Sequence, residues 1–322
     1  MKAIINDQYG PIEKLEQRDI AMPVCGDDEV LIRVQAAGLH VGDVFKVRGS
    51  PFPMRLATGL RRPSYGVPGF DLAGRVESVG KNVTRFKVGD EVFGSANGTC
   101  AEYSRAAERD VVAKPSGISF QEAASIPTSA LAALHGLRDA GKLRAGQRVL
   151  INGASGGVGS FAVQIAKALG ADVTGVCSTR NVELVRRLGA DRVIDYTRED
   201  FTSAGPKYDL IFDNIENRRV SDLRRALTPT GTLVLNSGTG AEGMRLLARL
   251  VGPLIRYAFS AQKVRRFVSA PKQSDLTLLA ELAAKGTLRP AIDSVYGFAD
   301  APAALRHIAT GHARGKVVVA IA

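Results

Sequence analysis

The stretch NGASGGVG at residues 152–159 separates an apolar run from a helical pattern. The apolar run ends at Asn152, and apolar residues recur at helical spacing across 157–169. A glycine-rich turn between a strand and a helix lets backbone N–H groups approach phosphate oxygens. The sequence therefore predicts a dinucleotide-binding turn rather than a merely structural one. The predicted contacts are Ala154, Ser155, Gly156, Gly157, Val158 and Gly159.

Single positions in this turn have separate roles. Gly156 lets the backbone approach the pyrophosphate, and Gly159 lets the helix pack closely on the preceding strand. The pattern departs from G-x-G-x-x-G at one place, because Ala154 stands where the first glycine is expected.

The end of the second strand of this unit indicates which dinucleotide binds. Proteins that bind NAD commonly place a carboxylate there to bond the ribose 2′-hydroxyl, whereas this chain has Ser178, Thr179 and Arg180. Ser178 and Arg180 can hold a 2′-phosphate, and Tyr196 can flank the phosphate or the adenine. We therefore predict NADPH, with a solvated Arg180 and an ordinarily packed Tyr196 as the alternatives.

Strand and helix patterns alternate in the middle of the chain, which indicates a parallel, doubly wound sheet. The first 120 residues read as strands and turns, and the tail returns to strand, helix and strand. The simplest layout is a β-rich head, an inserted α/β domain and a tail that rejoins the head. The predicted strands are 148–152, 173–177, 192–195, 208–214 and 231–237; the helices are 157–169, 181–188, 218–227 and 274–286.

The composition of the chain limits the classes of protein to which it can belong. The 322 residues carry a formal charge of +11, which favours anionic partners, but the basic pairs are scattered and make nucleic acid an unlikely partner. Three widely spaced cysteines argue against a disulfide framework. No apolar stretch reaches the roughly 18 residues of a membrane span. The amino-terminal sequence lacks a signal-peptide pattern, so we expect a cytoplasmic protein.

The chain resembles the zinc-free medium-chain dehydrogenase/reductases of the quinone oxidoreductase type along essentially its whole length. The resemblance implies a GroES-like catalytic domain at 1–122 and 272–322, and a Rossmann domain at 123–271, with the nicotinamide between them. The matching segments include GLHVGDVFKVRG (38–49), GVPGFDLAGRVESVG (66–80), AASIPTSALAALHGL (123–137), NGASGGVG (152–159) and HARGKVVV (312–319).

No metal site is expected from the resemblance. Zinc-dependent relatives carry a cysteine and a Gly-His-Glu segment, where this chain has His40 and Gly69-Phe70-Asp71. His135, His307 and His312 are interpreted as surface or helix-packing residues. His40 lies in the segment that lines the cleft in the family, where the pattern is often Asn-x-x-Asp and here ends at Asp43.

The resemblance also implies contacts outside the glycine-rich turn. Candidates for catalysis are His40 and Tyr65, both also placed beside the substrate with Asp43 and Arg48. The 55–69 segment is expected to cover the cleft mouth. The 240–272 segment is expected to form a basic amphipathic helix and loop, with a docking rim for an anionic acyl carrier or coenzyme A, or a subunit interface, as the alternatives. Family dimers commonly form through the edge of the Rossmann sheet, here near 232–236. The implied cofactor contacts are Thr128, Asn214, Ser237, Gly238, Phe267, Val268 and Lys316.

Without a metal, a conjugated acceptor is easier to reduce than a simple carbonyl, because the developing charge delocalises. We therefore predict a reductase of quinones or α,β-unsaturated carbonyls, small molecules that would be its partners. Two alternatives stay open: an enoyl reductase acting on thioester-bound intermediates, and a non-catalytic NADPH-binding sensor.

Overall fold

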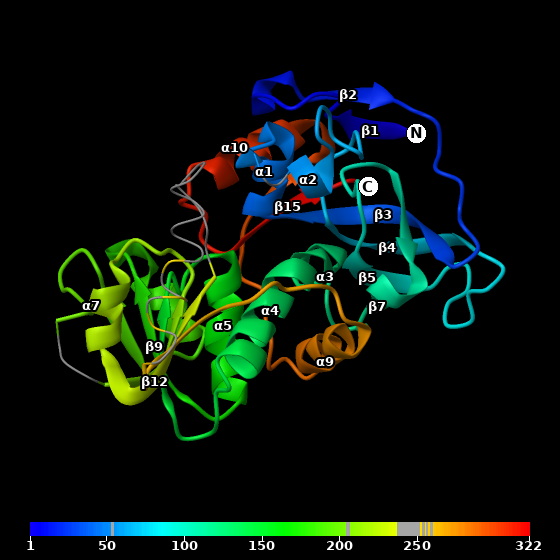
Figure 1. The fold of residues 1–322 in the computed structure, drawn as a ribbon. Coiled ribbons are helices and arrows are strands. Elements are labelled where there is room, and N and C mark those ends of the chain that lie inside the picture. Colours follow the sequence, from blue (N-terminus) through cyan, green and yellow to red (C-terminus); the bar gives the residue numbers. More distant parts are fainter. Residues whose placement is uncertain (53–54, 204–206, 237–251, 253–254, 256, 258–259) are drawn as a thin grey trace. The chain divides into compact units, whose positions relative to one another are not determined.

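The chain divides into two units in the computed structural model (Figure 1). Unit 1 comprises Met1–Leu131 and Ala270–Ala322, and unit 2 comprises Ala132–Ser269. The sequence predicts domain boundaries at 122 and 272. In the structure, residues 123–131 belong to unit 1, because helix α3 (Phe120–Ser125) packs on strands β3 and β4. The structure describes all residues except 53–54, 204–206, 237–251, 253–254, 256 and 258–259.

Unit 1 is built on a seven-stranded sheet in the order β14-β15-β3-β4-β5-β7, with β6 pairing β3. Its last strand in sequence, β15, is antiparallel to β3, so the tail does rejoin the head. A separate antiparallel pair joins β1 (Lys2–Ile5) to β2 (Glu16–Asp19). The strands of the large sheet are β3 (Glu29–Leu39), β4 (Asp71–Val79), β5 (Glu91–Ser95), β6 (Tyr103–Ala107), β7 (Val111–Ala113), β14 (Ile292–Gly297) and β15 (Lys316–Ala320).

Two helices, α1 (Val41–Arg48) and α10 (Ala301–Ala309), lie over one side of this sheet, and α3 lies on the other (Figure 1). Leu39, Val47 and Val317 share a buried apolar cluster with α10. Because both faces are covered, the far end of β3 is buried on both sides rather than half-buried. The other helices among the described residues of unit 1 are α2 (Arg55–Thr58), α9 (Gln273–Ala284) and short 3₁₀ turns, while α4 (Pro127–Leu134) spans the boundary.

Unit 2 contains a six-stranded sheet in which every pairing is parallel. Its order, β10-β9-β8-β11-β12-β13, is 3-2-1-4-5-6 in sequence order, the arrangement of dinucleotide-binding folds. The predicted doubly wound α/β sheet is therefore confirmed. Its strands are β8 (Arg148–Asn152), β9 (Asp172–Cys177), β10 (Arg192–Asp195), β11 (Tyr208–Asp213), β12 (Leu227–Leu235) and β13 (Lys263–Arg266).

The helices of unit 2 are α5 (Gly157–Ala168), α6 (Val182–Arg187), α7 (Val220–Arg225) and a π-helical stretch, His135–Ala140. Strand β13 pairs with β12, so the edge of the sheet does not lie at β12. The expectation that the sheet edge lies near 232–236 is therefore wrong. The basic segment 240–272 lies mostly outside the described residues. Among the described residues, no helix combines the length and apolar character needed to cross a membrane.

Candidate functional site

The glycine-rich turn joins β8 to α5 in unit 2. A Cβ on Gly159 would overlap the Gly153 carbonyl oxygen, so only glycine fits at this helix–turn contact. A Cβ on Gly156 would meet its nearest described protein atom at 3.4 Å, which leaves that backbone open to a ligand. Gly156 is also the N-cap of α5 and offers no side-chain acceptor to the first turn. The turn therefore fits a bound pyrophosphate.

Ala154, at the place of the first glycine, is fully buried. Its Cβ lies 3.0 Å from the position that a Cβ on Gly175 of β9 would take. Because Gly175 on the neighbouring strand has no side chain, it leaves space for the Ala154 methyl group.

Asn181 connects the turn to the end of the second strand. Its Nδ2 donates to Ser155 Oγ at 3.0 Å and to Ser178 Oγ at 3.3 Å, and the residue is only 6% exposed. Arg180 lies exposed in the same short turn, Thr179–Asn181. The structure therefore brings the two segments predicted to bind the dinucleotide together. Asn181 was not predicted as a site residue, because nothing in the local sequence pattern indicated that its amide is buried.

Asp195 is a carboxylate at the end of β10, and it was not among the residues predicted to contact the cofactor. It accepts hydrogen bonds from Thr179 Oγ1 at 2.6 Å and from Thr197 Oγ1 at 2.7 Å, and it lies 3.5 Å from Arg198. These hydrogen bonds, the one from Thr179 first, lower the pKa of Asp195 below its usual value. Neighbouring Tyr196 is half exposed, as a residue flanking an adenine would be.

An amide network lies at the carboxyl ends of β8, β11 and β12. Asn214 Nδ2 donates to the Asn152 carbonyl at 3.2 Å, and Asn236 Nδ2 donates to Asn214 Oδ1 at 2.8 Å. Phe267 packs against Phe212 with ring centroids 6.3 Å apart, whereas Val268 is 93% exposed. The predicted contacts Ser237 and Gly238 lie outside the described residues.

His40 is the N-cap of α1 in unit 1. Its Nδ1 accepts a hydrogen bond from the Gly42 N–H at 3.0 Å, so the proton of a neutral ring must lie on Nε2. Nε2 is buried and has no hydrogen-bond partner among the described residues. Burial lowers the pKa of His40 to about 4, which keeps the ring neutral at physiological pH. His40 thus presents one unused N–H donor.

Asp43 completes this N-terminal cap. Its Oδ2 accepts from the His40 backbone N–H at 2.9 Å, while its Oδ1 has no partner in the described part of the chain. Burial raises the pKa of this carboxyl to about 6. Asp43 therefore positions the His40 backbone. Arg48 lies exposed at the other end of α1, about 12 Å along the helix axis, and is not brought beside His40.

Phe70 and Lys46 complete the surroundings of His40. The rings of His40 and Phe70 stack with centroids 5.5 Å apart, so the two positions of zinc ligands in metal-dependent relatives are adjacent, and one carries no ligand atom. The buried Lys46 Nζ lies 4.6 Å from the Phe70 ring and 5.6 Å from the Tyr65 ring. Burial lowers the pKa of Lys46. No local pattern in the sequence predicted this buried cation.

Two residues predicted to bind the cofactor belong to a buried polar group in unit 1. Asp71 Oδ1 accepts from the N–H of Thr128 at 3.1 Å and from its hydroxyl at 2.5 Å. Lys316 Nζ donates to Ser129 Oγ at 3.0 Å and lies 3.5 Å from Asp71 Oδ2. Burial raises the pKa of Asp71. These contacts join β4, α4 and β15.

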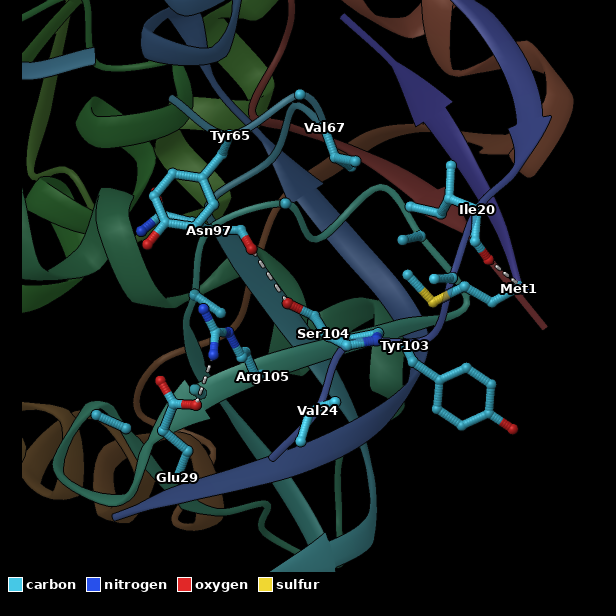
Figure 2. A pocket seen from close by; sticks show the side chains of 18 of the residues that line it. Met1, Ile20, Val24, Glu29, Tyr65, Val67, Asn97, Tyr103, Ser104 and Arg105 are labelled. Atoms are coloured by element: carbon cyan, nitrogen blue, oxygen red, sulfur yellow. Dashed lines mark hydrogen bonds and ion pairs between the residues drawn. The ribbon is translucent and has the colours of Figure 1, made fainter. Parts of the chain in front are cut away.

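Tyr65 is 46% exposed and lines a pocket of about 510 Å³ in unit 1 (Figure 2). Figure 2 shows the hydrogen bond from Ser104 Oγ to the Asn97 carbonyl, and the Arg105–Glu29 ion pair, in the pocket wall. His40 does not line this pocket. Among the described residues, Phe70 and Lys46 connect the two candidate catalytic side chains.

The other histidines have partners within their own units. His307 lies between Tyr296 Oη, 2.8 Å from its Nδ1, and Asp293, 3.0 Å from its Nε2. His135 Nδ1 is 2.9 Å from Ser269 Oγ. All three cysteines are free thiols.

Known proteins match this chain over nearly all of its length, and two family models match parts of it. The alcohol dehydrogenase GroES-like domain matches residues 26–136, and the zinc-binding dehydrogenase family matches residues 188–319. A 2-methylene-furan-3-one reductase of Solanum lycopersicum is 33% identical across 99% of this chain and 79% of its own. The NAD(P)H oxidoreductase RTN4IP1 of Danio rerio is 34% identical across 100% of this chain and 91% of its own.

A trans-enoyl reductase, pgmF, of Aspergillus terreus is 36% identical across 92% of this chain and 87% of its own. The solved quinone oxidoreductase of Coxiella burnetii superposes with a TM-score of 0.87 at 30% identity, covering 100% and 99% of the two chains. The relatives are named as reductases or oxidoreductases, RTN4IP1 as one that uses NAD(P)H, and the glycine-rich turn fits a nicotinamide dinucleotide. This chain is accordingly an oxidoreductase of the medium-chain dehydrogenase/reductase family, of the quinone oxidoreductase type.

Proposed function

We propose that the protein is an NADPH-dependent reductase that transfers hydride to α,β-unsaturated carbonyls or quinones, without a catalytic metal. The observation that carries this proposal is the neutral His40 ring, whose buried Nε2–H has no partner among the described residues. Such a donor suits an acceptor whose oxygen gains negative charge as the hydride arrives.

Each group has a defined task in this reaction. The reduced nicotinamide, when bound, supplies the hydride. His40 donates its Nε2–H to the substrate oxygen. The Gly42 N–H holds the ring, Asp43 holds the His40 backbone N–H, and Phe70 supports the face of the ring. A positioned donor of this kind typically contributes about 10²–10³ in rate. Tyr65 is a second candidate donor, and water can supply the final proton.

The choice of NADPH is supported by the residues at the end of β9. Ser178 and Arg180 suit a 2′-phosphate, and no carboxylate follows β9 directly. Asp195 on the neighbouring strand is engaged by hydroxyl groups and Arg198, which moderates its repulsion of that phosphate. A cytoplasmic location and a homodimer also stay predictions, since some relatives are named as mitochondrial or chloroplastic proteins.

The test is NADPH oxidation followed at 340 nm with EDTA present, over quinones, enones, enoyl thioesters and simple aldehydes, with NADH in parallel. We expect turnover of enones or quinones that EDTA leaves unchanged. Arg180→Ala should raise KM for NADPH and leave KM for NADH unaltered, because only NADPH carries the 2′-phosphate. Loss of all activity with EDTA would show that the metal-free mechanism is wrong.

A further inference from the structure

A second cavity in unit 1, of about 1240 Å³, lies between the turn that follows β1 and the loop that follows α2. Its walls include Asp7, Tyr9, Arg55, Leu60, Arg61 and Arg62. Neither the proposed reduction at His40 nor the dinucleotide turn uses these residues.

The loop that forms one wall is held by specific contacts. Tyr9 Oη donates to the Gly59 carbonyl at 2.6 Å and lies 2.8 Å from Thr58 Oγ1. The Ser64 N–H donates to the Thr58 carbonyl at 2.7 Å, which closes the turn. Gly59 has φ 112°, and a Cβ there would overlap the Arg62 carbonyl oxygen. The backbone of this turn therefore fixes the positions from which the side chains of Arg61 and Arg62 extend.

The cavity carries an excess of positive charge. Arg55 Nε donates to the Gly49 carbonyl at 2.9 Å, and its guanidinium carbon lies 4.6 Å from the Tyr9 ring centre. The lining carboxylate, Asp7, is already paired with Arg18 at 2.8 Å. Within the described part of the chain, Arg55, Arg61 and Arg62 have no carboxylate within 4.0 Å. Guanidinium groups without a counter-ion are suited to phosphate oxygens, which they bind through two parallel hydrogen bonds.

Exposed apolar side chains accompany these cations. Leu60 lines the cavity and is 59% exposed, and the ring of Phe52, 65% exposed, lies 5.7 Å from the Arg55 guanidinium carbon. Apolar surface beside three arginines suits an anion that also carries an aromatic or aliphatic part, rather than inorganic phosphate.

The cavity is connected to the proposed reaction centre by α1. Gly49, the C-cap of that helix, contacts Arg55, and His40 is its N-cap. The helix is eight residues long, about 12 Å. Arg55 and His40 therefore lie at opposite ends of this helix, so a ligand held at Arg55 needs a flexible arm to bring an acyl group toward His40.

We propose that this cavity binds the phosphoadenosine part of coenzyme A, so that the natural substrate is an enoyl group carried as its thioester. The proposal rests on the proposed reductase function and selects the carrier-bound substrate class within it. The arginines bind the phosphates, and the neighbouring apolar side chains contact the adenine and the pantetheine arm.

The first test compares crotonyl-coenzyme A with the crotonyl thioester of N-acetylcysteamine, which has the same reacting group and no phosphate. We expect a lower KM for the coenzyme A thioester. Arg61→Gln/Arg62→Gln should raise that KM by about tenfold or more and leave the KM for the short thioester unchanged. Lys81→Gln/Lys87→Gln, which removes the same charge at exposed sites of unit 1 away from the cavity, is the matched control.

The second test is calorimetric titration of adenosine 3′,5′-bisphosphate into protein saturated with NADPH, so that the dinucleotide site is occupied. We expect binding that the Arg61/Arg62 variant loses and the lysine variant keeps. Equal KM values for the two thioesters, or a tenfold preference for an acyl carrier protein thioester over both, would overturn the proposal. Reduction of no thioester or enone would contradict the reductase function instead, and the titration would still decide whether the cavity binds the bisphosphate.

Discussion

The His40 side chain uses its two ring nitrogens for different purposes. Nδ1 caps the amino terminus of α1 by accepting from the Gly42 N–H, and Nε2 keeps a proton that no described residue accepts. Sequence reasoning selected His40 from its place in a resembling segment. It could not give the tautomer, because the tautomer depends on a backbone N–H two residues away.

Replacing His40 tests both uses. His40→Asn keeps an acceptor for the cap and an N–H donor, whereas His40→Ala loses both. We expect kcat for an enone to fall about 10²-fold in the alanine variant and less in the asparagine variant. The alanine variant should also lose about 1 kcal/mol of stability, the usual cost of a lost N-cap. Steady-state kinetics and urea unfolding measure the two effects.

The pH dependence follows from the lowered pKa of His40. The folded ring protonates near pH 4 and the unfolded ring near 6.5, so the unfolded state binds more protons between these values. The stability that wild type gains from a neutral ring is complete above pH 6.5 and lost as pH falls toward 4. The difference in unfolding free energy between wild type and His40→Asn should therefore grow from pH 4 to 6.5. A difference that is constant with pH would contradict a neutral buried ring.

Element by element, periodicity located the strands of unit 2 well. The 192–195 strand has the predicted bounds, and the 231–237 prediction falls on a strand that begins four residues earlier. Helix α1 was not predicted. Its eight residues include Gly42 and three valines, which are poor helix formers, and its stability comes from its cap and from burial against α10.

The two glycines at the start of α5 should respond differently to the same substitution. Gly159→Ala forces a Cβ into the Gly153 carbonyl and should cost about 1–3 kcal/mol of stability. Gly156→Ala meets no protein atom closer than 3.4 Å, so its melting temperature should stay near wild type while its Kd for NADPH rises. Thermal unfolding and fluorescence titration distinguish the effects. Equal loss of stability in both variants would mean that Gly156 is structural too.

At the scale of the whole molecule, the chain ends inside the unit in which it begins. Lys316, six residues from the carboxyl end, lies beside Asp71 and Ser129 in the interior of unit 1. Strand patterns predicted that the tail rejoins the head. They could not pair these residues, because the three positions are separated by up to 245 residues and no local period links them.

Substitution of Lys316 distinguishes a structural role from a role in cofactor binding. Lys316→Met leaves a buried carboxylate without its cation and should destabilise the protein by about 3–5 kcal/mol. Adding Asp71→Asn should recover part of that loss, whereas exposed Lys285→Met should change stability by less than about 0.5 kcal/mol. If Lys316→Met keeps its stability and instead weakens NADPH binding, Lys316 serves the cofactor as the resemblance implies.

The double use of His40 also constrains how this chain can evolve. A residue at position 40 has to cap the amino terminus of α1 and, under the proposed mechanism, also offer a proton donor, so few residue types serve both needs. An amide side chain also has an acceptor and a donor, and the family resemblance implies asparagine at this position. Histidine and asparagine can thus both serve at position 40, and an exchange between them would alter reactivity while the fold persists.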